Sequence, residues 1–258
     1  MRIRVAAAAG TASAALLMTA FVSPAAQAGD APVITKVVVN KGKKIVIGPT
    51  AATNFSAQIT AKHPGGVSTA YVNLWHGASR DSADRAFSYD APRCTTSGTA
   101  TTCTMNFSVL ADTRDMTNVV SNAQAGTWHI YAYAYGKDRT ETAIDDYATT
   151  TVQRAAKLTA NASPEPVTKG KTLTVTGTLT RANWNTHKYA GYSGQKAALQ
   201  YRPKNSTTYT TVKTLTTNST GKLSTTVKAT ADGFYRFTYA GTSATAAATA
   251  PGDYIDVK

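Results

Sequence analysis

Closely spaced cysteines, paired histidines and long apolar runs are scarce in this sequence of 258 residues. Its two cysteines, Cys94 and Cys103, have the wrong spacing for a CxxC redox motif or a cysteine metal cluster. The four histidines are scattered, so they form no zinc-binding pair. After residue 28, no run approaches the roughly 20 apolar residues that a membrane-spanning helix needs. These absences argue against a redox protein, a zinc protein and a membrane-spanning mature chain.

Motifs of common catalytic sites are also missing. The sequence has no G-x-S-x-G nucleophile elbow, no Walker loop and no dinucleotide-binding glycine pattern after a strand. A serine hydrolase needs a nucleophile, a base and an orienting acid close together, but the histidines fall in unrelated loops and strands. We therefore expect no enzymatic activity, and a hydrolase with an unrecognised site is the alternative.

The first 28 residues have the pattern of a secretory signal peptide. Arg2 and Arg4 precede the apolar stretch AAAAGTASAALLMTAFV, and residues 26–28 (Ala-Gln-Ala) form a small-x-small cleavage site. A transmembrane anchor is the alternative, but the stretch is rich in Ala and Thr and leads straight into the cleavage site. We expect a secreted, extracellular mature chain that begins at Gly29.

In a secreted protein, Cys94 and Cys103 are expected to form a disulfide. The residues between them are rich in Ser, Thr and Gly, which suits a hairpin whose strands are tied near the turn. The chain-entropy model gives roughly 2–3 kcal/mol of stabilisation for so short a loop. The sequence therefore predicts a structural disulfide.

Short β-like runs broken by Gly, Pro, Asn and Asp fill the sequence, and long helical periodicity is absent. In residues 127–136 (TWHIYAYAYG), Trp128 and Ile130 alternate with His129 and Tyr131, so we expect His129 at the surface. Strands of this length and spacing are typical of a β-sandwich or barrel. The pattern therefore predicts an all-β fold.

The β-like runs form two sets that meet near residue 156. Residues 155–166 contain Pro164 and Pro166, which cannot sit in a central strand and so mark a linker or an edge. We predict two β-sandwich domains in tandem, at 29–156 and 157–258. A single larger β-domain is the alternative.

Basic residues are concentrated in the second half of the chain. Residues 157–258 contain 13 basic and 4 acidic residues, a net charge of +9, whereas residues 29–156 have a net charge of +2. A charge of this size attracts polyanions in a salt-dependent way, without reading sequence. No nucleic-acid motif is present, so we predict contact with an anionic polymer of the cell envelope or a carbohydrate, and no dedicated nucleic-acid binding.

Residues 181–196 (RANWNTHKYAGYSGQK) contain aromatic and basic residues but no acid. We expect this stretch to be a long loop at one end of the second sandwich. Aromatic rings beside cations can stack on sugars while the cations meet carboxylate or phosphate. Packing into the open end of the core is the alternative, and burial of Trp184 alone is worth about 2 kcal/mol. The candidate ligand-binding residues are Trp184, His187, Lys188, Tyr189 and Tyr192.

Residues 138–146 (DRTETAIDD) form an acidic group in a predicted inter-strand loop. Calcium takes six to eight oxygen ligands, often from loop carboxylates. Basic residues lie in the same loop and EF-hand spacing is absent, so a solvated charged loop is our main interpretation and we predict no cofactor. A calcium-stabilised structural protein is the alternative, with candidate ligands Asp138, Glu141, Asp145 and Asp146.

The segments SPEPVTKGKTLTVTGTLTRANW, KYAGYSGQKAALQYRP and GFYRFTYAGT resemble an immunoglobulin-like module of secreted proteins from high-GC Gram-positive bacteria. This resemblance covers nearly all of residues 158–258. The first half, with APVITKVVVNKGKKIVIGP and AGTWHIYAYA, is similar to an uncharacterised exported domain that accompanies such modules. The resemblance implies export, two immunoglobulin-like β-sandwich domains and no catalytic residue. We therefore expect a noncatalytic binding or envelope-associated protein.

Overall fold

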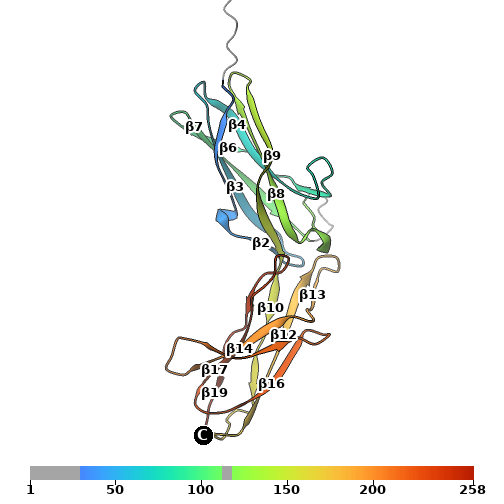
Figure 1. Cartoon of the computed structure of the whole chain (residues 1–258), viewed down its shortest axis with the longest axis vertical. Helices are drawn as coiled ribbons and strands as arrows, with labels where there is room; N and C mark the ends of the chain where they lie inside the picture. Colours follow the sequence, from blue (N-terminus) through green and yellow to red (C-terminus); the bar gives the residue numbers. More distant parts are fainter. Residues whose placement is uncertain (1–29, 112–117) are drawn as a thin grey trace, which may run out of the picture.

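The computed structural model describes residues 30–111 and 118–258, which form two β-sandwiches stacked end to end (Figure 1). The predicted signal peptide, residues 1–28, lies outside the described residues. Apart from strands, the described residues contain only two short 3-10 helices, η1 (Asn40–Gly42) and η2 (Asn122–Gln124). None of the helices in the described ranges is long and apolar enough to cross a membrane. The predicted all-β fold is confirmed.

The first sandwich contains nine strands in two sheets. One sheet has the order β1-β3-β7-β6 and the other has the order β2-β9-β8-β4-β5. The strands are β1 (Val33–Val39), β2 (Ile45–Ile47), β3 (Thr53–Lys62), β4 (Val67–His76), β5 (Arg85–Phe87), β6 (Arg93–Ser97), β7 (Ala100–Val109), β8 (Gly126–Gly136) and β9 (Glu141–Arg154). The strands are divided between two sheets as in immunoglobulin domains, where one sheet holds strands A, B, E and D and the facing sheet holds strands C, F and G.

Side chains alternate between the inner and outer faces of each strand, and the inward set forms the core of the first sandwich. In β8, Trp128 is fully buried between the sheets and stacks on Phe87 with ring centroids 4.0 Å apart. His129 points to the opposite, outer face as predicted, but it is half-buried there because it stacks on Trp75 at 4.3 Å. Each large apolar side chain buried in this way contributes about 1.5–3 kcal/mol.

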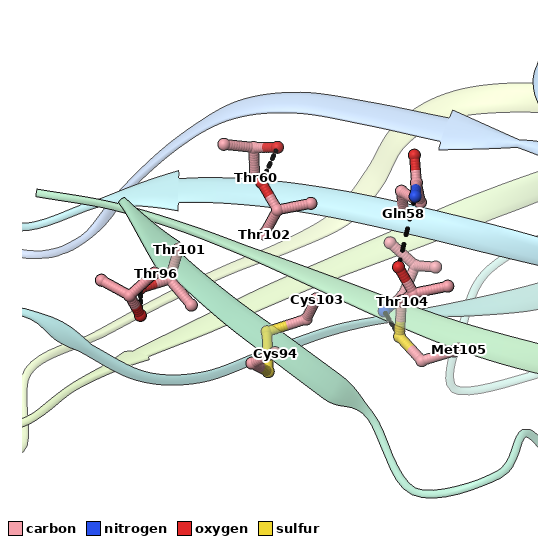
Figure 2. Close-up of a disulfide and its surroundings, with 10 residues drawn as sticks. Gln58, Thr60, Cys94, Thr96, Thr101, Thr102, Cys103, Thr104 and Met105 are labelled. Carbon is pink, nitrogen blue, oxygen red and sulfur yellow. Dashed lines mark hydrogen bonds between the residues drawn. A yellow bond between two sulfur atoms is a disulfide. The ribbon is translucent and has the colours of Figure 1, made fainter. Parts of the chain in front are cut away.

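The predicted disulfide between Cys94 and Cys103 is present and ties β6 to β7 (Figure 2). The two cysteines are direct cross-strand partners, and threonines around them pair as well, as in the 2.9 Å contact between the hydroxyls of the exposed Thr96 and the buried Thr101. Every residue of β6 is exposed, whereas Cys103 is fully buried. The disulfide therefore anchors an edge strand that has little apolar burial of its own.

The second sandwich contains ten strands. One sheet has β12 at its centre, with β10 and β11 on one side and β13 and β16 on the other; the second sheet has the order β15-β14-β17-β18, with β19 also pairing β17. The strands are β10 (Ala156–Leu158), β11 (Asn161–Ser163), β12 (Thr172–Asn183), β13 (Lys188–Gly191), β14 (Lys196–Pro203), β15 (Thr210–Thr216), β16 (Lys222–Lys228), β17 (Gly233–Tyr239), β18 (Ala248–Thr249) and β19 (Asp253–Ile255). This sandwich has the same immunoglobulin-like division as the first.

No linker separates the two sandwiches. Strand β9 ends the first sandwich at Arg154, and β10 begins the second at Ala156, so only Ala155 lies between them. The Ala155 backbone amide donates to the carbonyl of Ile47 in the first sandwich, and its carbonyl accepts from Ala182 in the second. Pro164 directly follows the edge strand β11, so the edge interpretation of the proline-containing stretch was right and the linker interpretation was wrong.

Candidate functional site

The aromatic and basic stretch at 181–196 is mostly a β-hairpin and not the long loop that we predicted. Strand β12 ends at Asn183 and β13 begins at Lys188, leaving a four-residue turn. The Asn183 side chain closes this turn by accepting hydrogen bonds from the backbone amides of Asn185 (3.1 Å) and Thr186 (3.2 Å). Asparagine favours such turns because its side-chain oxygen reaches the backbone two residues on.

Trp184, in this turn, is buried in the core of the neighbouring sandwich. Its side chain is 1% exposed and belongs to the apolar cluster of the first sandwich. The indole Nε1 donates to the carbonyl oxygen of Ile47 at 3.1 Å, and the backbone amide donates to Asn122 Oδ1 at 2.9 Å. The packing alternative was therefore right, but Trp184 fills the end of the other sandwich instead of its own.

Polar contacts surround Trp184 at the junction between the sandwiches. The Asn122 side chain donates to Asn183 Oδ1 at 2.8 Å. The buried Arg154 donates from Nε to the carbonyl of Ala182 at 2.6 Å. Burial, with a smaller contribution from the charge of Arg181, lowers the pKa of Arg154 to about 10. The hairpin turn therefore serves as a structural contact between the sandwiches.

The other predicted ligand-binding residues differ in exposure. Tyr189 is half-buried against the first core, and burial raises its pKa. Tyr192 packs on the second core, and His187 is half-buried in the turn. Lys188 is the only one of the five that is exposed. A ligand site made of these five residues stays a prediction, and Trp184 could join it only if the sandwiches separated.

The four predicted calcium ligands are spread along the β8–β9 turn and strand β9. Residues 141–154 form a strand, so the predicted acidic loop is shorter than expected. In the part of the chain that the structure describes, no three potential ligands lie close enough to hold a metal ion. Each carboxylate has a protein partner instead: Asp138 with Thr140 Oγ1 (2.7 Å), Glu141 with the Tyr133 hydroxyl (2.6 Å), Asp145 with Arg80 (3.0 Å) and Asp146 with His129 (3.0 Å).

Two of these hydrogen bonds shift a pKa, that of the acid Asp138 in one case and that of the donor Tyr133 in the other. The hydroxyl of Thr140 is the main cause that lowers the pKa of Asp138. The hydrogen bond to Glu141 is the main cause that raises the pKa of Tyr133 to about 12, because the bond favours the protonated phenol. At neutral pH the Tyr133 hydroxyl therefore stays protonated and bound to Glu141, and Asp138 stays ionised and bound to Thr140 in the turn between β8 and β9.

A second aromatic and basic group, which shares no residue with the predicted sites, lies on the outer face of the β15-β14-β17-β19 sheet. We call it the arginine face and define it as Arg202, Tyr209, Phe234, Arg236 and Tyr254, all half-buried. The Arg236 guanidinium carbon is 3.6 Å from the Tyr209 ring centroid, and that of Arg202 is 3.9 Å from the Phe234 centroid. The sequence GFYRFTYA (233–240) shows two alternating sets of side chains, but it does not show which set faces outward from the sheet.

No family model matches the chain, and no curated protein matches it. Solved structures with similar folds include dimeric latent PorU from Porphyromonas gingivalis, with 11% identity, a TM-score of 0.30, and coverage of 88% of this chain and 20% of PorU. The D00-D0 domain of intimin has 13% identity, a TM-score of 0.29, and coverage of 85% and 99%. The three N-terminal domains of the Hoc capsid protein of bacteriophage RB49 have 9% identity, a TM-score of 0.32, and coverage of 88% of this chain and 70% of those domains. This chain spans about a fifth of PorU, and the similarities are too distant to indicate a function.

Proposed function

We propose that this protein is an exported, noncatalytic binding protein that associates with an anionic polymer or carbohydrate of the cell envelope through its basic second sandwich. The observation that supports this proposal best is the exposed positive charge of residues 157–258. Every lysine of this sandwich is exposed. Within residues 157–258, all of which are described, only Lys204 and Lys258 form ion pairs with carboxylates.

This arrangement produces a net positive field at the surface of the second sandwich. The thirteen basic residues have only four acidic residues to balance them. Exposed cations without nearby carboxylates attract polyanions over about a Debye length, which is about 8 Å at physiological salt. The pattern of residues 1–28 and the disulfide support export, because disulfides persist in oxidising compartments.

A pulldown of the mature chain (29–258) against fractionated envelope polymers at low and high salt tests the proposal. We expect binding to an anionic fraction that weakens by about tenfold or more when salt is raised from 50 to 500 mM. Binding that survives high salt would assign the contact to aromatic stacking instead of charge. Absence of binding to every fraction at low salt would contradict the proposed function.

A further inference from the structure

We propose that the arginine face binds the carboxylate groups of an acidic polysaccharide, with Arg202 and Arg236 as the anchoring cations. This inference rests on the proposed function and deepens it, because it names one surface of the second sandwich and one ligand chemistry. On this face, Arg202 lies beside two aromatic rings and Arg236 beside one, and Tyr209 is shared by both arginines.

Strand register brings the two arginines to one face. Strands β14 and β17 are antiparallel, with Gln200 opposite Arg236 and Arg202 opposite Phe234. Tyr235, between Phe234 and Arg236, is buried in the core, so its two neighbours point outward. The two arginines are therefore diagonal neighbours on adjacent strands. Two positive charges lie close together on this face as a result.

Aromatic rings hold both guanidinium groups in place. The Tyr209 ring centroid lies 3.6 Å from the Arg236 guanidinium carbon and 5.4 Å from that of Arg202. The Arg202 guanidinium carbon also lies 3.9 Å from the Phe234 ring centroid. Cations stacked on rings in this way are oriented before a ligand arrives, which lowers the entropy cost of binding.

The arginines keep most of their donors for a ligand. Arg202 donates to the backbone carbonyl of Ser206 at 2.7 Å, and Arg236 donates from Nε to Gln200 Oε1 at 2.9 Å. A guanidinium has five N–H donors in a planar fork that matches a carboxylate. Within the described ranges, neither arginine lies in ion-pair distance of an acid.

The acidic residues beside this face already have protein partners. Asp253 of β19 accepts a hydrogen bond from the Ala162 amide of the other sheet at 2.7 Å. Asp232 precedes β17 and accepts hydrogen bonds from the Val257 backbone amide (2.9 Å) and the Tyr254 hydroxyl (3.2 Å). Lys204 lies 3.5 Å from its carboxylate. Its charge is therefore balanced locally, and the field over the two arginines stays positive.

The surroundings of the arginines favour a polysaccharide over a nucleic acid. The Gln200 side chain and the exposed threonines of β15 supply amide and hydroxyl groups for sugar hydroxyls. Tyr254 packs beside Phe234 with centroids 5.1 Å apart and widens the aromatic surface for the C–H faces of sugar rings. A nucleic-acid backbone needs a row of cations. On this sheet Lys204 pairs with Asp232, Lys213 donates to Thr225 of the other sheet, and Lys196 lies at the opposite end of β14 from Arg202.

Titration calorimetry of the mature chain with polygalacturonate tests the inference, with methyl-esterified polygalacturonate as the uncharged control. The double variant Arg202→Gln/Arg236→Gln is compared with Lys222→Gln/Lys228→Gln, which removes the same charge from the other sheet. We expect at least about tenfold weaker binding for the arginine variant, because it loses charge-assisted hydrogen bonds. For the lysine variant we expect a loss of less than about threefold. The variant Arg202→Lys/Arg236→Lys keeps both positive charges but loses the planar guanidinium groups that bind a carboxylate through two hydrogen bonds. We therefore expect it to bind about fivefold more weakly than wild type.

Four outcomes would overturn the inference. Equal losses in the two glutamine variants would mean diffuse attraction, and the proposed function would stand without this site. Equal binding of the esterified polymer would refute carboxylate recognition. Tighter binding of single-stranded DNA or polyphosphate, lost in the same arginine variant, would assign the face to a phosphate polymer. Wild-type protein that binds neither polygalacturonate nor any envelope fraction would refute the inference and the proposed function together.

Circular dichroism melting checks that each variant is folded. If the double variant unfolds, the single variants Arg202→Gln and Arg236→Gln replace it.

Discussion

At the scale of single residues, Trp184 has the largest structural consequence. It belongs to the second sandwich by sequence but to the first by burial, with an exposed fraction of 1%. Its hydrogen bond to Ile47 spans 137 positions of the chain. One side chain therefore completes the core of the first sandwich and joins it to the second.

We expect Trp184→Ala to destabilise the first sandwich by about 3–5 kcal/mol, because it removes a buried aromatic ring and leaves a cavity. For a protein of this size, that loss corresponds to a fall of roughly 10 °C in melting temperature. Circular dichroism melting measures it, with Tyr254→Ala, a half-buried aromatic of the outer face, as the control. A fall of 2 °C or less would mean that Trp184 does not support the core.

At the scale of elements, the β6–β7 hairpin depends on its disulfide. Strand β6 is exposed along its whole length, so apolar burial contributes little to holding it. We expect Cys94→Ala/Cys103→Ala to lower the free energy of unfolding by about 2–3 kcal/mol through the freed loop entropy of the unfolded chain. Chemical denaturation measures this loss. The control Thr96→Ala/Thr101→Ala removes a hydroxyl pair of the same hairpin and should cost about 1 kcal/mol, and equal losses in both variants would contradict the prediction.

The end of the chain after β19 depends on Asp232 and is therefore sensitive to acid. The hydrogen bond from the Val257 amide is the main cause that lowers the pKa of Asp232. A carboxylate with a lowered pKa in the folded state stabilises that state above the ordinary pKa of about 3.9, and the contribution is lost as pH falls through the lowered value. Asp232→Asn should therefore lower the melting temperature at pH 7 and make it fall less between pH 5 and pH 3.

Melting curves of wild type and Asp232→Asn at pH 7, 5 and 3 measure this difference. Asp256→Asn is the matched control, because Asp256 lies in the same terminal segment and its contact with Lys258 is long, at 3.8 Å. A gap between wild type and Asp232→Asn that is as large at pH 3 as at pH 7 would refute the assigned role.

The acidic residues that suggested a calcium site lie apart from one another, mostly along strand β9. Its carboxylates pair with Tyr133, Arg80 and His129, and their side chains are distributed along the strand. We expect the melting temperature in millimolar calcium to equal that in a chelator, because ligand binding to the folded state would raise it. Magnesium is the control for ionic strength. A rise specific to calcium would restore the calcium-stabilised alternative.

At the scale of the whole molecule, the two sandwiches share a boundary without a linker. The junction includes Ala155, the Trp184 side chain and the hydrogen bonds of Asn122 and Arg154. Because the first core includes Trp184, the fragment 29–156 lacks part of its own core. We expect this fragment to melt at a lower temperature than the first sandwich within the full chain, as calorimetry would measure. A fragment of equal stability would contradict the coupling.

The sequence by itself determined the strands, the disulfide and the uneven charge. Strands alternate side chains with a period of two, so Trp128 and Ile130 could be placed in a core from their spacing alone. The two cysteines are nine positions apart, and a local hairpin is enough to join them. The +9 charge of the second half is a sum over residues and needs no structure.

Only the tertiary structure decided where Trp184 packs and which side chains share the arginine face. Trp184 looked like a plug for its own sandwich, but its partner Ile47 is 137 positions away. Arg202 and Arg236 are 34 positions apart and meet only because β14 pairs with β17 in one register. Contacts between distant segments depend on how whole sheets pack, and residue spacing within a segment contains no information about that packing.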